Sequence, residues 1–239
     1  MKKLCLLIGL GLTLTFCKAG GEWISKTLQQ SEKPTEVETV QGLKEALSIG
    51  TKKSVSQLSK AGGFYSNPSI KLLFPSEASK VENSLRKLGF NKLCDDTILS
   101  LNRAAEYASK EASGIFLQAI KKMSFADAWD ILLSQNSHAA TQYLERSSTQ
   151  ALTQAFSPII KKSLDQAHAT KYWSDVMTQY NRIPLVQPVQ TDLVSFTNQK
   201  ALEGLFFSLS KEEEKIRNQF SFRSTALLKK VFGYADKQK

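Results

Sequence analysis

The sequence predicts an all-α protein, built mostly as a helical bundle. Apolar residues recur at helical spacing almost without interruption from Gly42 onward. Capping side chains, glycines and prolines divide these periodic runs into separate helices. With 41% hydrophobic and 23% charged residues, the 239-residue chain has the composition of a globular protein rather than a disordered one.

The first seventeen residues predict a signal peptide of the lipoprotein type. A basic start precedes the apolar run Leu4–Leu14, which leads to Cys17. Such a run is typical of a secretory signal and is too short to span a membrane. A cysteine at its end indicates a lipid-anchored bacterial envelope protein, although Phe16 replaces the small residue usual before a lipidated cysteine. Ordinary cleavage after Ala19, which would leave a soluble periplasmic or secreted protein, stays open.

The rest of the chain is divided by composition. We assign residues 1–17 to the signal peptide, 18–40 to a polar tether, 41–233 to a single helical domain and 234–239 to a basic tail. About 220 residues after the signal are enough for one substantial core.

The first half of the domain contains four predicted helices. The first spans Gly42–Ser59 and ends before the glycine pair 62–63, since glycine adopts the left-handed conformations of a helix C-terminus. The second spans Ser76–Leu88 and is closed by Gly89. The next two, Asn91–Ala112 and Gly114–Met123, form the predicted centre, because their small residues permit close helix packing.

The second half continues in the same way. Ser124 and Asp127 form a capping-box pattern for a helix over 125–133, and Ser137 can cap the next one. Pro158 is expected in the first turn of a further helix, where its missing amide costs little. Helices are also expected over 170–181, from Asp192 to Asn218 and over 223–232. Tyr172, Trp173, Val176 and Tyr180 form an aromatic stripe in 170–181, which core packing explains better than a ligand site does.

Two apolar runs are not helical. The run 70–74 is bounded by turn signals, and the run 183–189 contains Pro184 and Pro188. These two extended runs could pair as short strands.

Net charge and cysteine content limit the partners. The formal charge of +10 falls to about +8 after removal of the signal, and the surplus is spread over lysine pairs typical of solvated helix faces. An anionic lipid or acidic polymer partner in the envelope fits this charge, as does an envelope protein, whereas nucleic acid does not fit an exported protein. Cys94 is the one thiol left if Cys17 is lipidated, and we expect it to be a small buried hydrophobe. If Cys17 is retained without lipid, the sequence also allows a disulfide bond between Cys17 and Cys94.

Motifs for catalysis, metals or cofactors are missing. The two histidines, His138 and His168, have no second ligand at helical spacing, and no phosphate-binding glycine loop follows the signal. We therefore expect no metal, no cofactor and no catalytic residue. The best polar cluster is Asn102, Arg103 and Glu106, whose spacing places the asparagine and the glutamate on one helix face.

Glu213 and Arg217 belong to a second charged cluster on the last long helix. If the two helices meet, a Glu–Arg network would tie the bundle together. The alternative is a polar pocket, with Arg103 binding an anion or Glu106 acting as a general base.

Segments along most of the domain resemble the domain of unknown function 4197 family of exported bacterial proteins. The matching segments include Gly42–Leu47, the Gly62-Gly63-Phe64 turn with Asn67-Pro68, Ser100–Glu106, Phe156–Ile159, Tyr180-Asn181, Gly204–Phe206, Glu212–Arg217 and Leu227–Gly233. The resemblance implies a signal-bearing helical envelope protein and lends no catalytic residues. Tyr180 and Asn181, which also close an aromatic stripe, complete the set of candidate ligand or network residues.

Three functions are weighed. The first is a non-enzymatic, lipid-anchored binding or interaction module in the periplasm or cell envelope. The second is a carrier of an apolar or anionic small molecule in a cavity between helices. The third is an enzyme that uses Asn102, Arg103 and Glu106.

Overall fold

The computed structural model describes residues 33–182, 185, 188 and 192–238. The chain divides into two compact units, residues 1–33 and 34–239. The predicted signal peptide, Cys17 and the start of the predicted tether lie outside the described residues, as does most of the run 183–189. All described helices belong to the unit that begins at Pro34.

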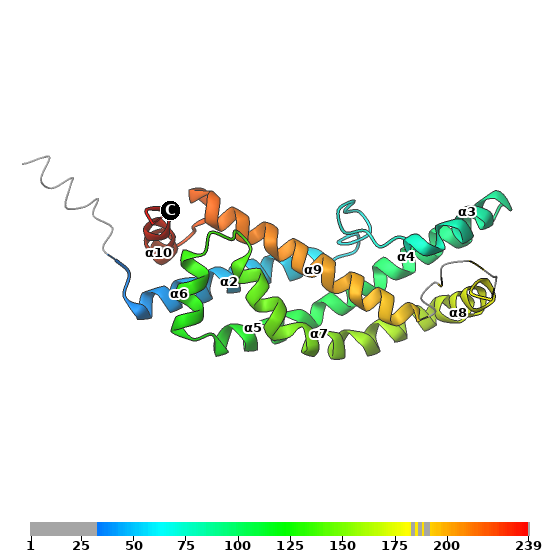
Figure 1. Cartoon of the computed structure of the whole chain (residues 1–239), viewed down its shortest axis with the longest axis horizontal. Coiled ribbons are helices and arrows are strands. Elements are labelled where there is room, and N and C mark those ends of the chain that lie inside the picture. The colour runs from blue at the N-terminus through cyan, green and yellow to red at the C-terminus, as the bar shows by residue number, and fades with distance from the viewer. Residues whose placement is uncertain (1–32, 183–184, 186–187, 189–191, 239) are drawn as a thin grey trace, which may run out of the picture. The chain divides into compact units, whose positions relative to one another are not determined.

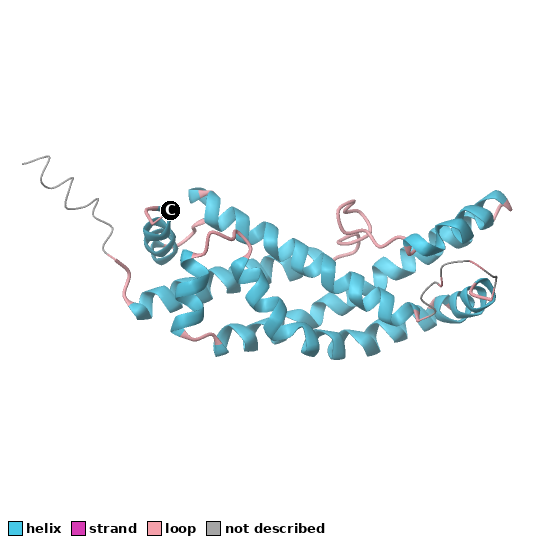
Figure 2. Ribbon diagram, in the orientation of Figure 1, coloured by secondary structure: helices cyan, strands magenta, loops and turns pink. Residues whose placement is uncertain are grey.

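This unit is all-α, as predicted (Figures 1 and 2). In chain order its α-helices and short 3₁₀ helices (η) are α2 (Glu36–Leu58), η1 (Ser76–Ala78), α3 (Ser79–Lys87), α4 (Asn91–Ala108), η2 (Ser109–Glu111), α5 (Ala112–Lys122), α6 (Phe125–Leu133), α7 (Ala139–Gln166), α8 (Ala169–Tyr180), α9 (Leu193–Asn218), η3 (Phe220–Phe222) and α10 (Ala226–Asp236).

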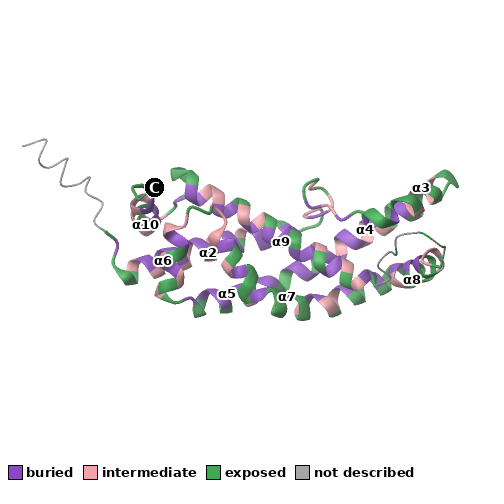
Figure 3. Ribbon diagram, viewed as in Figure 1, coloured by how far each residue is buried: buried purple, intermediate pink, exposed green. Residues whose placement is uncertain are grey.

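The core lies where four long helices meet. α7 packs along α9 and α4, while α2 packs on α9, α5, α6 and α10. On α4, Ala104, Ala105 and Ala108 are fully buried, so the predicted small-residue face does bring the helices close together. Figure 3 shows the buried faces of these helices turned toward one another and the exposed faces turned outward.

Local signals fix several helix ends. Ser124 and Asp127 form the predicted capping box at the start of α6, and Asp192 accepts hydrogen bonds from two amides of α9. Gly62 and Gly89 have φ angles of +86° and +88°, the left-handed conformation for which glycine was expected. α2 begins earlier than predicted, at Glu36, because Thr35 and Glu38 form a capping box within the predicted tether.

Pro158 does not lie in the first turn of a helix, so that prediction is wrong. α7 runs unbroken from Ala139 to Gln166, with Pro158 inside it. A proline there removes one backbone hydrogen bond and disturbs the preceding turn. Asn198 of α9 supports this turn by donating from Nδ2 to the Thr153 carbonyl at 2.9 Å and to Ser157 Oγ at 2.7 Å. Sequence alone does not show this support from another helix.

The predicted strand pairing is not found in the part of the chain that the structure describes. Residues 71–75 are extended, as expected, but form no strand. The backbone of Leu72 pairs instead with the side chain of Asn102: its N–H donates to Oδ1 at 2.9 Å, and its carbonyl accepts from Nδ2 at 2.8 Å. One amide side chain thus provides the two hydrogen bonds that a neighbouring strand would have made.

Candidate functional site

The predicted polar residues form two separate buried clusters. We call Asn102, Arg103 and Glu106 on α4 the loop clamp, and Glu213 and Arg217 on α9 the helix-end clamp. Each cluster completes its hydrogen bonds with other parts of the chain rather than with the other cluster, so the predicted joint network of α4 and α9 does not form.

The carboxylate of Glu106 holds the glycine turn that follows α2. Its Oε1 accepts hydrogen bonds from the backbone N–H groups of Phe64 and Tyr65 at 3.1 and 3.2 Å. Its Oε2 accepts from the guanidinium of Arg103 at 2.6 Å. Glu106 is 2% exposed, so its charge is buried but paired. With Asn102 on Leu72, the loop clamp fixes both arms of the loop between α2 and α3.

This arrangement leaves Glu106 poorly suited to catalysis. A general base needs an oxygen that can reach the proton of a substrate. Both oxygens of Glu106 already accept hydrogen bonds within the protein, and its side chain is enclosed. Asn102 likewise uses its oxygen and its nitrogen on backbone groups. The loop clamp is thus built to position a loop.

The helix-end clamp joins α9 to the start of α7. Glu213 Oε1 accepts from the amide of Ala140 at 3.0 Å, and Oε2 accepts from the amide and the hydroxyl of Thr141, both at 2.8 Å. These amides belong to the first turn of α7, where N–H groups lack partners within the helix. The N-cap residue, His138, makes no capping bond with its side chain. Glu213 therefore caps α7 from another helix, where the helix dipole also favours a negative charge.

Arg217 extends this clamp to the end of α6. Its Nε donates to Glu213 Oε1 at 2.8 Å, and its terminal nitrogen atoms donate to the carbonyls of Ile131 and Leu132 at 2.8 and 3.5 Å. Those carbonyls lie in the last turn of α6, where partners within the helix are missing. One buried ion pair thus serves two helix ends. Arg223 serves a third, since it donates to the carbonyls of Ile216 and Arg217 near the end of α9.

Tyr180 and Asn181 stand apart from both clamps. They lie at the end of α8, where Tyr180 is partly buried against the core and the amide of Asn181 bonds to the Met177 carbonyl. Cys94 is buried, as expected. Burial raises the pKa of this thiol above its usual value, which keeps it protonated and unreactive.

An apolar pocket lies between α4 and α8. It has a volume of about 190 Å³, and its apolar lining includes Leu85, Leu93, Trp173 and Met177. A larger groove of about 810 Å³, with a mixed polar and apolar lining, runs between residues 69–77 and α9. Pockets for drug-sized ligands usually measure about 300–1,000 Å³. The apolar pocket therefore has room only for a small ligand or the end of one alkyl chain.

Sequence reasoning missed a surface that we call the basic-aromatic face. It consists of Phe207, Phe220 and Phe222 with Lys53, Lys211, Lys215 and Lys229. Each of these lysines holds its ammonium group 5.2–5.9 Å from the centre of one of the rings. The available signal was the Phe-Ser-Phe sequence of η3, which separates two helices whose adjoining turns carry lysines.

Glu212 lies between two of these lysines. Its carboxylate contacts Lys53 at 2.8 Å and Lys215 at 2.6 Å. Burial by itself raises the pKa of Glu212, but the hydrogen bonds from Lys215 and Lys53 outweigh burial and leave the pKa below its ordinary value.

None of the described helices combines the length and apolar content needed to cross a bilayer. Within the described ranges, no three His, Cys, Asp or Glu side chains are grouped so that they could hold a metal ion.

Comparison with known proteins supports the resemblance read from the sequence. The model of one family, described as "Protein of unknown function (DUF4197)", matches residues 33–233. No curated protein and no solved structure matches the chain.

Proposed function

The chain belongs to the DUF4197 family, whose function is unknown, and we propose that it is an exported, lipid-anchored envelope protein that acts by binding a partner. The observation that carries the binding role is the state of its buried polar groups. Glu106 and Glu213, the buried acids on which a catalytic proposal would depend, are committed to loop and helix-end contacts. The residues left for interaction with other molecules are those on the surface and in the pocket linings.

The export and anchoring parts of the proposal are supported by the N-terminal sequence. A basic start, a short apolar run and Cys17 follow one another in the order of a lipoprotein signal. Two or three acyl chains on Cys17 would anchor the protein stably, whereas one chain would bind only marginally.

Metabolic labelling with a palmitate analogue tests the anchor. We expect label on the wild-type protein in the membrane fraction and none on Cys17→Ser. Phe16→Ala restores a small residue before the cysteine and should label at least as well as wild type. An unlabelled wild-type protein, or an uncleaved chain in the cytosol, would overturn this part of the proposal.

In-cell crosslinking followed by mass spectrometry tests the binding role. We expect a reproducible crosslinked partner, protein or lipid, from surface lysines such as Lys211, while the fold stays intact. Hydrolase and transferase activity screens, with Glu106→Gln beside wild type, test the alternative. A turnover that disappears in Glu106→Gln without a change in melting temperature would contradict a non-catalytic role.

The apolar pocket favours a second candidate, a carrier for a small apolar molecule. Its apolar lining of Leu85, Leu93, Trp173 and Met177 suits an alkyl group, and its volume of about 190 Å³ limits the size of that group. Short-chain fatty acids should raise the melting temperature of wild type by mass action. They should also change Trp173 fluorescence. Ala169→Phe, which narrows the pocket, should abolish both effects; the absence of any shift in wild type would end this candidate.

A further inference from the structure

Two exposed phenylalanines lie in η3, the short 3₁₀ helix between α9 and α10. Phe220 is 63% exposed and Phe222 is 37% exposed, both on η3. Single exposed apolar residues are common on protein surfaces. These two differ because they share the basic-aromatic face with Phe207 and a group of lysines.

The face carries a surplus of positive charge. Four lysines belong to it, and the neighbouring carboxylates in contact with them are Glu212 and Glu214. Lys229 lies over the Phe220 ring at 5.4 Å, and Lys53 lies over the Phe222 ring at 5.2 Å. Each ring is thus next to an ammonium group on a long flexible stem. Apolar side chains beside lysines suit the boundary between lipid headgroups and acyl chains, where rings enter the apolar layer and ammonium groups contact phosphates.

The position of the face agrees with this chemistry. α10, which follows η3, contacts the first turn of α2 through an ion pair of 2.7 Å between Lys230 and Glu38. η3 and α10 therefore lie toward the end of the bundle where the described unit begins (Figure 1), whereas Lys53, Lys211 and Phe207 lie further along α2 and α9. Whatever their conformation, the residues between Cys17 and Pro34 span no more than about 60 Å. A lipid on Cys17 would thus keep this end close to a bilayer and raise its effective concentration there.

We propose that the basic-aromatic face docks on the surface of an anionic lipid bilayer, with Phe220 and Phe222 entering the headgroup boundary. This deepens the proposed binding role, because it names the partner. It does not require Cys17 to be lipidated, since the charge and the rings are present in the unit that begins at Pro34.

Vesicle binding by residues 34–239, a piece that lacks Cys17 and so carries no lipid anchor, tests the inference. This piece is a compact unit that holds the whole described core, so it can be studied by itself. We expect binding to vesicles of equal parts phosphatidylcholine and phosphatidylglycerol, and little binding to pure phosphatidylcholine. The double variant Phe220→Ser/Phe222→Ser should bind roughly tenfold or more weakly, from the loss of two buried rings.

A matched control comes from the turn between α3 and α4. Leu88 is 73% exposed and Phe90 is 51% exposed, so Leu88→Ser/Phe90→Ser removes as much exposed apolar surface at another place. This control should bind anionic vesicles as wild type does. Equal loss in both double variants would mean that exposed apolar residues act without regard to position, and would overturn the proposal.

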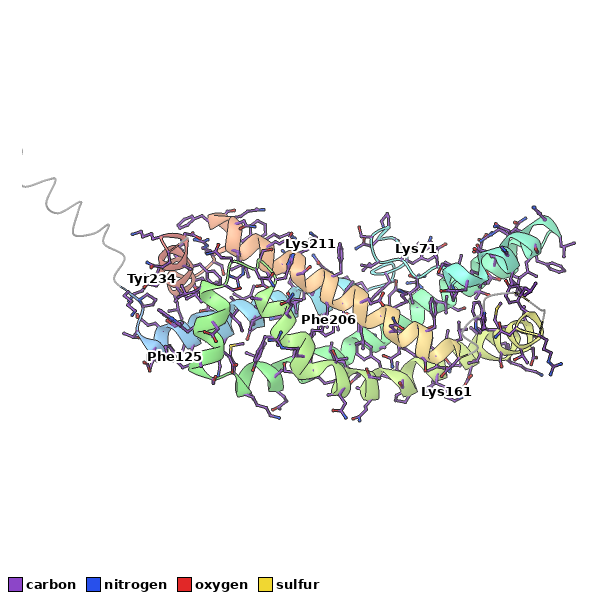
Figure 4. All side chains as sticks on the ribbon, viewed as in Figure 1. Lys71, Phe125, Lys161, Phe206, Lys211 and Tyr234 are labelled. Atoms are coloured by element: carbon purple, nitrogen blue, oxygen red, sulfur yellow. The ribbon has the colours of Figure 1, made fainter. Side chains whose placement is uncertain are left out.

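The lysines are tested in the same assay. Lys211→Gln/Lys229→Gln should weaken binding by more than tenfold, because each lysine near an anionic surface contributes roughly a factor of five. Lys161→Gln/Lys162→Gln on α7 removes the same charge away from the face and should have a clearly smaller effect; Figure 4 shows Lys161 well apart from Lys211.

Two further outcomes would refute membrane docking. One is the absence of binding to anionic vesicles by a protein whose circular dichroism and melting temperature are normal. The other is tight binding of soluble polyphosphate that Phe220→Ser/Phe222→Ser leaves unchanged, since an acidic polymer needs no apolar insertion. A negative palmitate test of Cys17 together with positive vesicle binding would remove the anchor and leave the docking face in place.

Discussion

Substitution of Glu106 by glutamine tests whether the loop clamp is structural. The change keeps the shape of the side chain and one oxygen for the amides of Phe64 and Tyr65. It removes the negative charge that accepts from Arg103 at 2.6 Å. A hydrogen bond to a charged group contributes about 1.5–3 kcal/mol. Arg103 can turn to water because its side chain is 35% exposed, so it adds little further penalty.

We therefore expect Glu106→Gln to lower the free energy of unfolding by about 2 kcal/mol, which corresponds to about 4–8 °C in melting temperature. Glu106→Ala also leaves the amides of Phe64 and Tyr65 without an acceptor and should cost more, about 3–5 kcal/mol. Urea unfolding of residues 34–239 measures both values. Glu145→Gln, on the exposed side of α7, is the matched control and should stay within about 0.5 kcal/mol of wild type.

Hydrogen exchange adds a local readout that distinguishes the loop clamp from a general loss of stability. The amides of Phe64 and Tyr65 should exchange faster in Glu106→Gln, whereas the amide of Leu72, held by Asn102, should change less. An unchanged melting temperature, or unchanged exchange at Phe64 and Tyr65, would refute the assignment of Glu106 to the loop.

Three other expectations concern the packing of α9. Arg217→Met leaves the buried carboxylate of Glu213 without its charged partner and should cost about 3–5 kcal/mol in urea unfolding; a loss under about 1 kcal/mol would contradict the helix-end clamp. Gly204→Ala places a Cβ 2.5 Å from an aromatic carbon and should destabilise by about 1–3 kcal/mol, whereas Gly114→Ala, with open space around it, should be neutral or stabilise by up to about 1 kcal/mol; equal effects would contradict the close approach. The lowered pKa of Glu212 means that its stabilising effect is complete above about pH 4.3, the unfolded value, and is lost at lower pH as the folded carboxyl takes up its proton. The difference in melting temperature between wild type and Glu212→Gln should therefore shrink in acid. A difference that grows in acid would contradict a lowered pKa of Glu212.

The sequence predicted best what depends on near neighbours along the chain. The capping box of Ser124 and Asp127 and the left-handed Gly62 and Gly89 are local, so residue types alone suffice to place them. The predicted small-residue face of α4 was correct for a related reason, since helical spacing decides which alanines share a face.

Contacts between distant residues were not predictable in the same way. Pro158 lies inside α7, and Asn198, forty positions further along, donates hydrogen bonds to the turn that precedes it. The extended run near Leu72 pairs with Asn102 rather than with a strand. In each case an amide side chain satisfies backbone groups of another segment, and no periodicity in the sequence encodes which segment that is.

For the candidate site, too, the sequence did not show which groups the charged residues contact. Spacing predicted that Arg103 reaches Glu106 and grouped Glu213 with Arg217 in a charged cluster, and each of these glutamates does form an ion pair with that arginine. It could not tell a pair that serves a ligand from a pair that serves the backbone, because the difference lies in which donors occupy the remaining carboxylate oxygens. In both pairs those donors are amides of a loop or a helix end. Since a buried charge is tolerated only when it is paired and hydrogen-bonded, the same contacts that make these glutamates stable in the core withhold them from a substrate. On the surface, by contrast, the exposed rings of Phe220 and Phe222 lie beside lysines, an arrangement that supports the proposed docking on an anionic lipid bilayer.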